Sequence, residues 1–205
     1  MDYNIHMNKN IQGFTLIELI VTLAVVSILL LTGIPMLTQM TTSNRLVTQI
    51  NSIAGSLSVA RSESIKRGVS ITLCGSTDGA TCDTSSWESG WIVFSDADNN
   101  AVLNSATETR LKIVAPFSGG STLRLSESDS TSVIRYRSDG SLRDMDGDAT
   151  RTNKGTFTLC EQSASTTTAK AINLNPLGRV SRAEDTDATP DKIVNDINGA
   201  DVTCP

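Results

Sequence analysis

A long apolar segment near the N-terminus is the most conspicuous pattern in the chain. Between Phe14 and Leu31 only four residues are not apolar, and they do not form a polar face. About 20 apolar residues are enough for a helix to cross a bilayer. A buried core helix would show a polar face, and a cleavable secretory signal would have a shorter apolar stretch followed by small residues. The pattern therefore predicts a membrane helix that is retained in the mature protein.

The helical pattern continues beyond this segment. After Arg45, residues suited to a buried face recur at alternating steps of four and three, which is typical of an amphipathic helix. These residues are Leu46, Ile50, Ile53, Leu57, Ala60 and Ser64. Lys66 and Arg67 suit the C-terminal end of the helix dipole, and Gly68 is a stop signal. We expect one helix from Phe14 to Arg67, loosened or kinked at Gly33 and Pro35.

Beyond Gly68 the chain consists of short runs rich in β-branched residues, with Gly, Asp, Asn and Ser turns between them. The predicted strands are 69–74, 90–96, 109–115, 122–126, 132–137, 155–160 and 169–174. Leu123 and Leu125 alternate with Arg124, as in a strand with one buried face. The fold class is therefore predicted as α+β, with a mostly antiparallel sheet packed on the helix. The acidic tail from Ala183 to Asp201 lacks periodicity, so we expect a surface loop.

Composition argues against an enzyme. The single histidine, His6, precedes the apolar segment, which removes most histidine-dependent chemistry from the globular part. The sequence also lacks a G-x-S-x-G nucleophile motif and a phosphate-binding loop. Only 4% of the residues are aromatic, and the net charge of -5 gives no general attraction for nucleic acid. We predict neither catalysis nor a cofactor.

Glu18 is the unusual residue of the apolar segment. A carboxylate inside a membrane helix costs a few kcal/mol and is usually functional or paired. The segment contains no Lys or Arg that could pair with it. If the chain were cut between Gly13 and Phe14, the new α-amino group of one subunit could neutralise Glu18 of a staggered neighbour. Glu18 would then serve assembly.

The residues Gly13-Phe14-Thr15-Leu16-Ile17-Glu18 resemble the signature of type IV pilins and pseudopilins. The resemblance implies that a prepilin peptidase cleaves after Gly13 and methylates Phe14, and that Glu18 sets subunit registration. Residues 1–13 would be the leader, with Met7 as an alternative start. The implied architecture is the type IV pilin fold, with a membrane and assembly helix at 14–35, its amphipathic continuation at 36–67, and a β-rich globular domain at 68–205.

A second resemblance covers more of the chain. The segments Ala60–Ser64, Arg67–Val69, Thr72–Cys74, Gly90–Phe94 and Leu177–Val180 are similar to the GspH/FimT group of minor pilins and pseudopilins, and the last of them is expected to be a final strand. The cysteine-bearing loops favour the FimT/FimU type. The implied function is a minor pilin that primes assembly of a type IV pilus and sits at or near its tip. The alternative is a minor pseudopilin of a type II secretion system.

The same resemblance implies partners and a location. The partners would be the prepilin peptidase, the inner-membrane assembly platform, and other minor pilins and the major pilin, or pseudopilins. The protein would cross the bacterial inner membrane once, with its globular domain in the periplasm, and would later reach the pilus or pseudopilus tip.

A third function, DNA uptake, depends on two arginines. Proteins of the FimT type have a G-R-x-R motif that contacts DNA, and the sequence Gly178-Arg179-Val180-Ser181-Arg182 is similar but has its second arginine one position late. In a strand this shift would put Arg179 and Arg182 on opposite faces. The acids Glu184, Asp185 and Asp187 follow directly. Four further arginines could form a basic patch or simply a solvated face: Arg124, Arg135, Arg137 and Arg143.

The four cysteines favour disulfides, since an exported domain meets an oxidising compartment. No pair has C-x-x-C spacing and the globular part has no histidine, so zinc is disfavoured. Three connectivities are possible, and we favour Cys74–Cys82, which closes a small loop, with Cys160–Cys204, which fastens the tail.

Two acidic clusters have the carboxylate-rich composition of calcium sites. Asp96 and Asp98 begin like a calcium-binding loop, but Ala101 stands where glycine is needed and the closing glutamate is missing. Asp144, Asp146 and Asp148 are too few to fill a calcium shell. We therefore expect solvated turns at both places and no metal.

Overall fold

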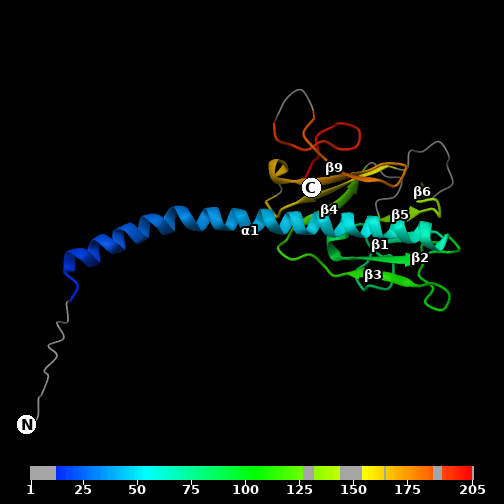
Figure 1. Ribbon diagram of the computed structural model, residues 1–205, viewed down its shortest axis with the longest axis horizontal. Helices are drawn as coiled ribbons and strands as arrows, with labels where there is room; N and C mark the ends of the chain where they lie inside the picture. Colours follow the sequence, from blue (N-terminus) through cyan, green and yellow to red (C-terminus); the bar gives the residue numbers. More distant parts are fainter. Residues whose placement is uncertain (1–12, 127–131, 144–153, 164, 187–190, 205) are drawn as a thin grey trace, which may run out of the picture. The chain divides into compact units, whose positions relative to one another are not determined.

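The computed structural model describes residues 13–126, 132–143, 154–163, 165–186 and 191–204, drawn in colour in Figure 1. The chain divides into two compact units, residues 1–41 and 42–205, and each is described by itself. The predicted leader up to residue 12 and the cluster Asp144, Asp146 and Asp148 lie outside the described residues.

Helix α1 (Leu16–Arg67) is the element shared by both units. It continues without a break through Gly33 and Pro35, so the expected kink does not interrupt the helix. It is long and apolar enough to cross a membrane, and the large apolar side chains from Leu16 to Leu31 are all exposed. At its end, Gly68 has φ +67° and donates its N–H to the Ser64 carbonyl at 3.0 Å, which confirms the predicted stop.

The second half of α1 is amphipathic, as predicted. All six positions predicted for the buried face are buried: Leu46, Ile50, Ile53, Leu57, Ala60 and Ser64. Ser56 is buried on the same side and donates its hydroxyl to the Ser52 carbonyl within the helix. This stripe packs against the rest of the globular unit and forms part of its main hydrophobic core.

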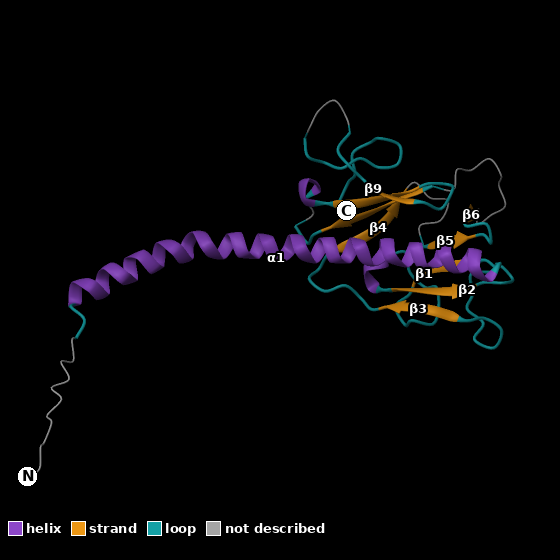
Figure 2. Cartoon of the chain, in the orientation of Figure 1, coloured by secondary structure: helices purple, strands orange, loops and turns teal. Residues whose placement is uncertain are grey.

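The strands form two antiparallel sheets, not the one sheet implied by the sequence (Figure 2). The first sheet has the order β3-β2-β1-β5-β6. Its strands are β1 (Ile71–Gly75), β2 (Trp91–Ser95), β3 (Arg110–Val114), β5 (Val133–Tyr136) and β6 (Leu142–Arg143). The second sheet has the order β4-β7-β8-β9. Its strands are β4 (Thr122–Ser126), β7 (Gly155–Cys160), β8 (Lys170–Leu174) and β9 (Val180–Arg182).

The main core lies between α1 and the inner faces of both sheets. Alternate residues such as Leu73, Val93 and Leu159 point into it, which explains the period of two seen in the sequence. The short 3-10 helix η1 (Trp87–Ser89) inserts Trp87, whose ring meets Phe157 edge to face at a centroid distance of 5.0 Å. A second 3-10 helix, η2 (Thr166–Thr168), precedes β8.

Two small apolar clusters cover the outer faces of the sheets. On the first sheet, Cys74, Ile92, Phe94 and Val133 pack with Cys82, Ala101 and Leu103. On the second, Cys160 and Ala171 pack with Ala183 and Val202 of the C-terminal tail. The composition of the tail predicted a surface loop. This prediction is wrong for part of the tail, because Ala183 and Val202 are buried on the sheet.

Candidate functional site

The side chains at the start of the pilin-like segment are exposed. Phe14 is 84% exposed, and Glu18 lies in the first turn of α1. The Glu18 backbone N–H donates to the Thr15 hydroxyl at 3.3 Å, which is the N-cap contact of a capping box. An acid in the first turn also complements the positive end of the helix dipole. These contacts give Glu18 a local role in starting the helix. The apolar segment itself contains no Lys or Arg that could pair with the Glu18 carboxylate.

Arg179 and Arg182 do not form the arrangement expected from the sequence. Residues 175–179 form a turn, in which Asn175 accepts the Arg179 N–H on its side-chain oxygen, and strand β9 starts only at Val180. The predicted strand at 177–180 is therefore displaced. Arg179 precedes the strand and Arg182 ends it, opposite Ile172 of β8.

Gly178 of the same motif has a structural function. It adopts φ +71°, and an added Cβ would lie 2.2 Å from the Gly140 carbonyl oxygen and 2.7 Å from the Tyr136 ring. Only glycine fits such a close approach of two backbones. Arg61 of α1 donates its Nε–H to the same Gly140 carbonyl at 3.1 Å. This bond joins the backbone at Gly140, against which Gly178 packs, to the helix.

Arg61 and Arg179 both line one groove, between α1 and the turn that contains Gly178. The groove holds about 410 Å³. It is lined by Ser58, Arg61, Ser62, Ile65, Gly178, Arg179 and Val180. Arg182 is not among the lining residues, so the structure pairs Arg179 with an arginine of the helix and not with the second arginine of the motif.

The acidic loop after β2 is organised around a buried ion pair. Asp96 is fully buried, and its Oδ2 lies 2.9 Å from the Nε of Arg135, which is only 3% exposed. Asp96 also accepts the Thr72 hydroxyl at 2.6 Å and the backbone N–H groups of Asn100 and Ala101. The register places Thr72 opposite Arg135 on neighbouring strands β1 and β5, so the three side chains meet on the outer face of the first sheet. The expectation of a solvated turn is wrong for Asp96.

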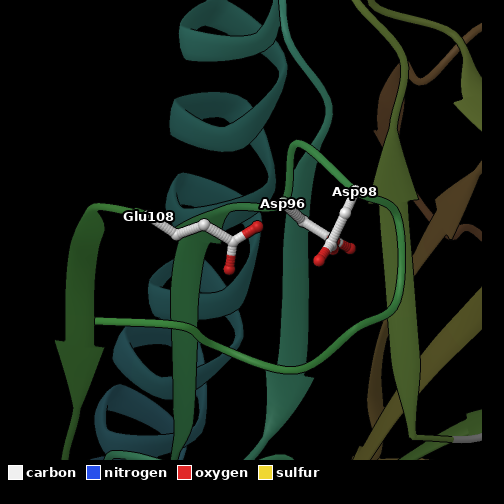
Figure 3. A group of neighbouring side chains, drawn as sticks. All are labelled: Asp96, Asp98 and Glu108. Carbon is white, nitrogen blue, oxygen red and sulfur yellow. The ribbon is translucent and has the colours of Figure 1, made fainter. Parts of the chain in front are cut away.

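Three carboxylates approach one another in this loop. Oxygens of Asp96, Asp98 and Glu108 lie within 4.8 Å of one another, and Figure 3 shows their side chains directed toward a shared space. The oxygens of Glu108 accept the N–H groups of Ala97 and Asn104, both at 2.9 Å. Since Asp96 and Glu108 already serve protein donors, the geometry is that of a loop fastened by hydrogen bonds, and it fits a hydrated calcium shell poorly.

Ion pairing also removes part of the proposed basic patch. Arg135 is buried against Asp96, and Arg124 of β4 pairs with Glu88 of η1. Arg137 and Arg143 remain exposed. These long-range pairs are not predicted from the sequence, because Arg135 and Asp96 are 39 residues apart. The signal in the sequence that could have predicted the buried pair is Asp96 itself, which directly follows the buried strand β2.

The two disulfides have the connectivity favoured from the sequence. Cys74 pairs with Cys82, and Cys160 with Cys204, with sequence separations of 8 and 44 residues. In the loop closed by the first bridge, Asp78 accepts the N–H groups of Thr81 and Ala80, and these bonds hold the pKa of its carboxyl well below the usual range. The second bridge joins the end of β7 to the tail.

Comparisons with known proteins give consistent results. The family model described as "Type II transport protein GspH" matches residues 49–178, and the model described as "Prokaryotic N-terminal methylation motif" matches residues 8–34. Among curated protein sequences, none matches the chain.

Solved structures share the fold. The type IV minor pilin FimU of Pseudomonas aeruginosa is 18% identical, and the match has a TM-score of 0.51 over 75% of this chain and 98% of FimU. A second crystal form of FimU gives a TM-score of 0.48 at 18% identity, over 72% of this chain and 99% of FimU. The GspH model alone matches more than half of the chain. The chain therefore belongs to the GspH family of pilin-like structural proteins, with a pilin-type N-terminal methylation motif.

Proposed function

We propose that this protein is a minor pilin that primes the assembly of a type IV pilus and remains at or near its tip. The observation that carries the proposal is Glu18, the only charged residue of an apolar, exposed segment that lies within the region matched by the methylation motif. Such a segment needs apolar surroundings, and a membrane and a filament core both provide them. The globular unit follows the same family, and the solved structure with its fold is a pilus subunit by name.

In this proposal the protein begins as a single-pass subunit of the bacterial inner membrane, with residues 42–205 in the periplasm. The prepilin peptidase removes the leader after Gly13 and methylates Phe14. The new amine of one subunit then pairs with Glu18 of its neighbour, and this pairing sets the stagger of the helices. The other partners are minor pilins, the major pilin and the assembly platform.

Replacement of Glu18 tests the proposal. The variant Glu18→Ala keeps the cleavage site, so we expect normal insertion and leader removal but at least about tenfold less protein in sheared pili, because the buried amine has no counter-ion. The measurement is immunoblotting of membrane and pilus fractions with the mass of the mature chain. The matched control is Ser27→Ala, which removes a hydroxyl bonded only within the helix, to the Leu23 carbonyl. Normal incorporation of Glu18→Ala would refute the pairing.

The secretion alternative shares Gly13, Phe14 and Glu18 and differs in the machine. It receives support from the description of the family model, whereas the disulfide-bearing loops favour the pilus. Deletion of the gene decides between them. Loss of surface pili with normal protein secretion is expected, and the reverse outcome would assign the protein to a type II secretion system.

DNA uptake is the second candidate, and one observation favours it. Two cations, Arg61 and Arg179, line the same groove, and clustered cations bind phosphates. The test is DNA binding by the disulfide-bonded protein at increasing salt. Binding that weakens steeply with salt and disappears in a variant lacking Arg179 and Arg182 would favour uptake. We expect no such binding, because the second arginine is displaced and Glu184 and Asp185 follow it.

A further inference from the structure

Strand β9 is the last strand of the second sheet, and no described strand pairs with its outer edge. Just beyond β9, the Ala183 N–H donates to the Ala171 carbonyl of β8 at 3.0 Å. Bonded and non-bonded residue pairs alternate along two antiparallel strands, so Ser181 also bonds to β8. Val180 and Arg182 are the non-bonded residues, and their N–H and C=O groups therefore point to the outer edge of the sheet.

The C-terminal tail supports this direction of the backbone groups. Glu184 is the next residue of the same series, and its carbonyl accepts the Asn195 N–H at 3.1 Å. The tail thus pairs with the outer edge one step beyond β9. For the N–H and C=O groups of Val180 and Arg182, no hydrogen bond at this edge is found among the described residues.

The opposite edge of the same sheet, formed by β4, is closed by side chains. The Leu123 N–H donates to the Glu88 carboxylate at 3.1 Å, and the Leu123 carbonyl accepts Nη1 of Arg124 at 3.1 Å. Proteins commonly close strand edges in such ways, because an open edge can pair with another chain. The open edge of β9 is therefore a candidate site for an added strand.

The open edge lies at the groove between α1 and the turn that contains Gly178, because Val180 lines that groove. On the α1 side, Ile65 is 53% exposed and gives the groove an apolar surface. Arg61 and Arg179 also line the groove, and neither has an ion pair among the described residues. We propose that this groove binds an extended acidic segment of another protein chain, which adds as a strand to β9.

The chemistry of the edge favours a peptide over a nucleic acid. An open strand edge presents donors and acceptors, and a peptide backbone offers both in return. A phosphate backbone offers acceptors, so the carbonyls of Val180 and Arg182 would face phosphate oxygens without a proton between them. Carboxylates of the added segment can form charge-assisted hydrogen bonds with Arg61 and Arg179. Glu184 repels carboxylates at the far end of β9, so the acidic part of the segment should lie at the Arg179 end.

The inference goes beyond the proposed function, since it does not depend on which machine the subunit joins. The test uses the full chain in uncharged detergent micelles. The probe is an acetylated and amidated hexapeptide of alternating valine and glutamate, and the backbone amide NMR signals of Val180 and Arg182 report its binding. A second peptide is N-methylated at every residue, so it keeps its side chains and charge but has no backbone donors. We expect the first peptide to shift both signals and the second to bind at least about tenfold more weakly, because it cannot donate to the edge.

A variant of the groove provides the second arm of the test. Arg179→Gln should weaken binding of the acidic peptide about threefold, as expected for an exposed ion pair. The matched control Arg110→Gln, at an exposed arginine of edge strand β3 in the first sheet, should bind like the parent. A peptide with lysine in place of glutamate should bind more weakly than the acidic one and should not respond to Arg179→Gln.

Three outcomes would overturn the proposal. Equal binding of the N-methylated peptide would show that the backbone edge is not used. An excess of the acidic peptide that leaves the signals of Val180 and Arg182 unchanged would show that the groove does not accept a strand. A single-stranded DNA oligonucleotide that shifts these signals where the peptide does not would assign the groove to nucleic acid.

Discussion

The segment from Phe14 to Thr41 and the unit from Thr42 to Pro205 differ in whether their large apolar side chains are exposed or buried. In the first, every large apolar side chain from Leu16 to Leu31 is exposed, so none of them is buried against another part of the chain that the structure describes. In the second, residues such as Trp87, Trp91 and Leu57 are completely buried. In the proposed function a membrane or other subunits would cover the first region, whereas the second region buries its own apolar side chains.

The two regions also differ in how far apart in the sequence their interacting residues lie. In the proposed function the information in the first region is local, because the proposed cleavage, methylation and charge pairing would all involve residues within six positions, Gly13 to Glu18. The information in the second is long-range, as in the pairing of Asp96 with Arg135 across 39 residues. Substitutions in the first region should therefore change processing and assembly, and substitutions in the second should change stability.

The largest expected effect is at the cleavage site. Replacement of Gly13 by tryptophan places a bulky side chain at the proposed cleavage site, so we expect leader removal to be abolished, with an unshifted mass of the full precursor. The fold of residues 42–205 should be unchanged, as judged by its thermal unfolding. A cleaved Gly13→Trp protein would contradict the assignment of the site, and an unfolded one would contradict the independence of the two regions.

The next effect, in the globular unit, is at the buried ion pair. Asp96→Ala leaves Arg135 buried without a counter-ion and frees three further donors, so we expect a loss of about 3–5 kcal/mol in the free energy of unfolding. Urea unfolding of the mature chain measures it.

The control is Asp98→Asn, an exposed neighbour in the same loop, with an expected change below about 0.5 kcal/mol. Both proteins are also compared with calcium and with a chelator, and we expect no difference. Equal losses in the two variants would contradict the weight given to the buried ion pair, and a gain with calcium that Asp98→Asn abolishes would show that the three carboxylates act together on a metal.

Sequence patterns gave the elements more reliably than their assembly. The strand ranges 122–126 and 155–160 agree with β4 and β7, because their alternation and β-branched residues are local signals. The division into two sheets was not visible, since it depends on which strands pair. Arg135 shows the reason: its place in the sequence suggested a surface patch, and only the register of β5 beside β1 puts it next to Asp96.

The tail disulfide has a somewhat smaller expected effect. A protein with Cys160→Ser and Cys204→Ser loses a bridge across 44 residues, which the chain-entropy model values at about 3–4 kcal/mol. Calorimetry of the mature chain should show this loss, and protease should cut near the released tail first, because Ala183 and Val202 depend on the bridge to stay packed. Unchanged stability would mean that these apolar contacts hold the tail alone.

The smallest effect is expected on the exposed side of α1 within the globular unit. Gly55 is exposed, has helical geometry, and an added Cβ would meet no atom within 4 Å. Gly55→Ala should therefore stabilise the protein by about 0.5–1 kcal/mol, because alanine restricts the unfolded chain and favours the helix. Thermal unfolding detects such a change, and Gly178→Ala, where the added Cβ would clash with Gly140, should have the opposite sign. A Gly55→Ala protein that is stabilised but enters pili poorly would show that a neighbouring subunit packs closely on this side of α1, and that the dependence on other subunits extends into the globular unit.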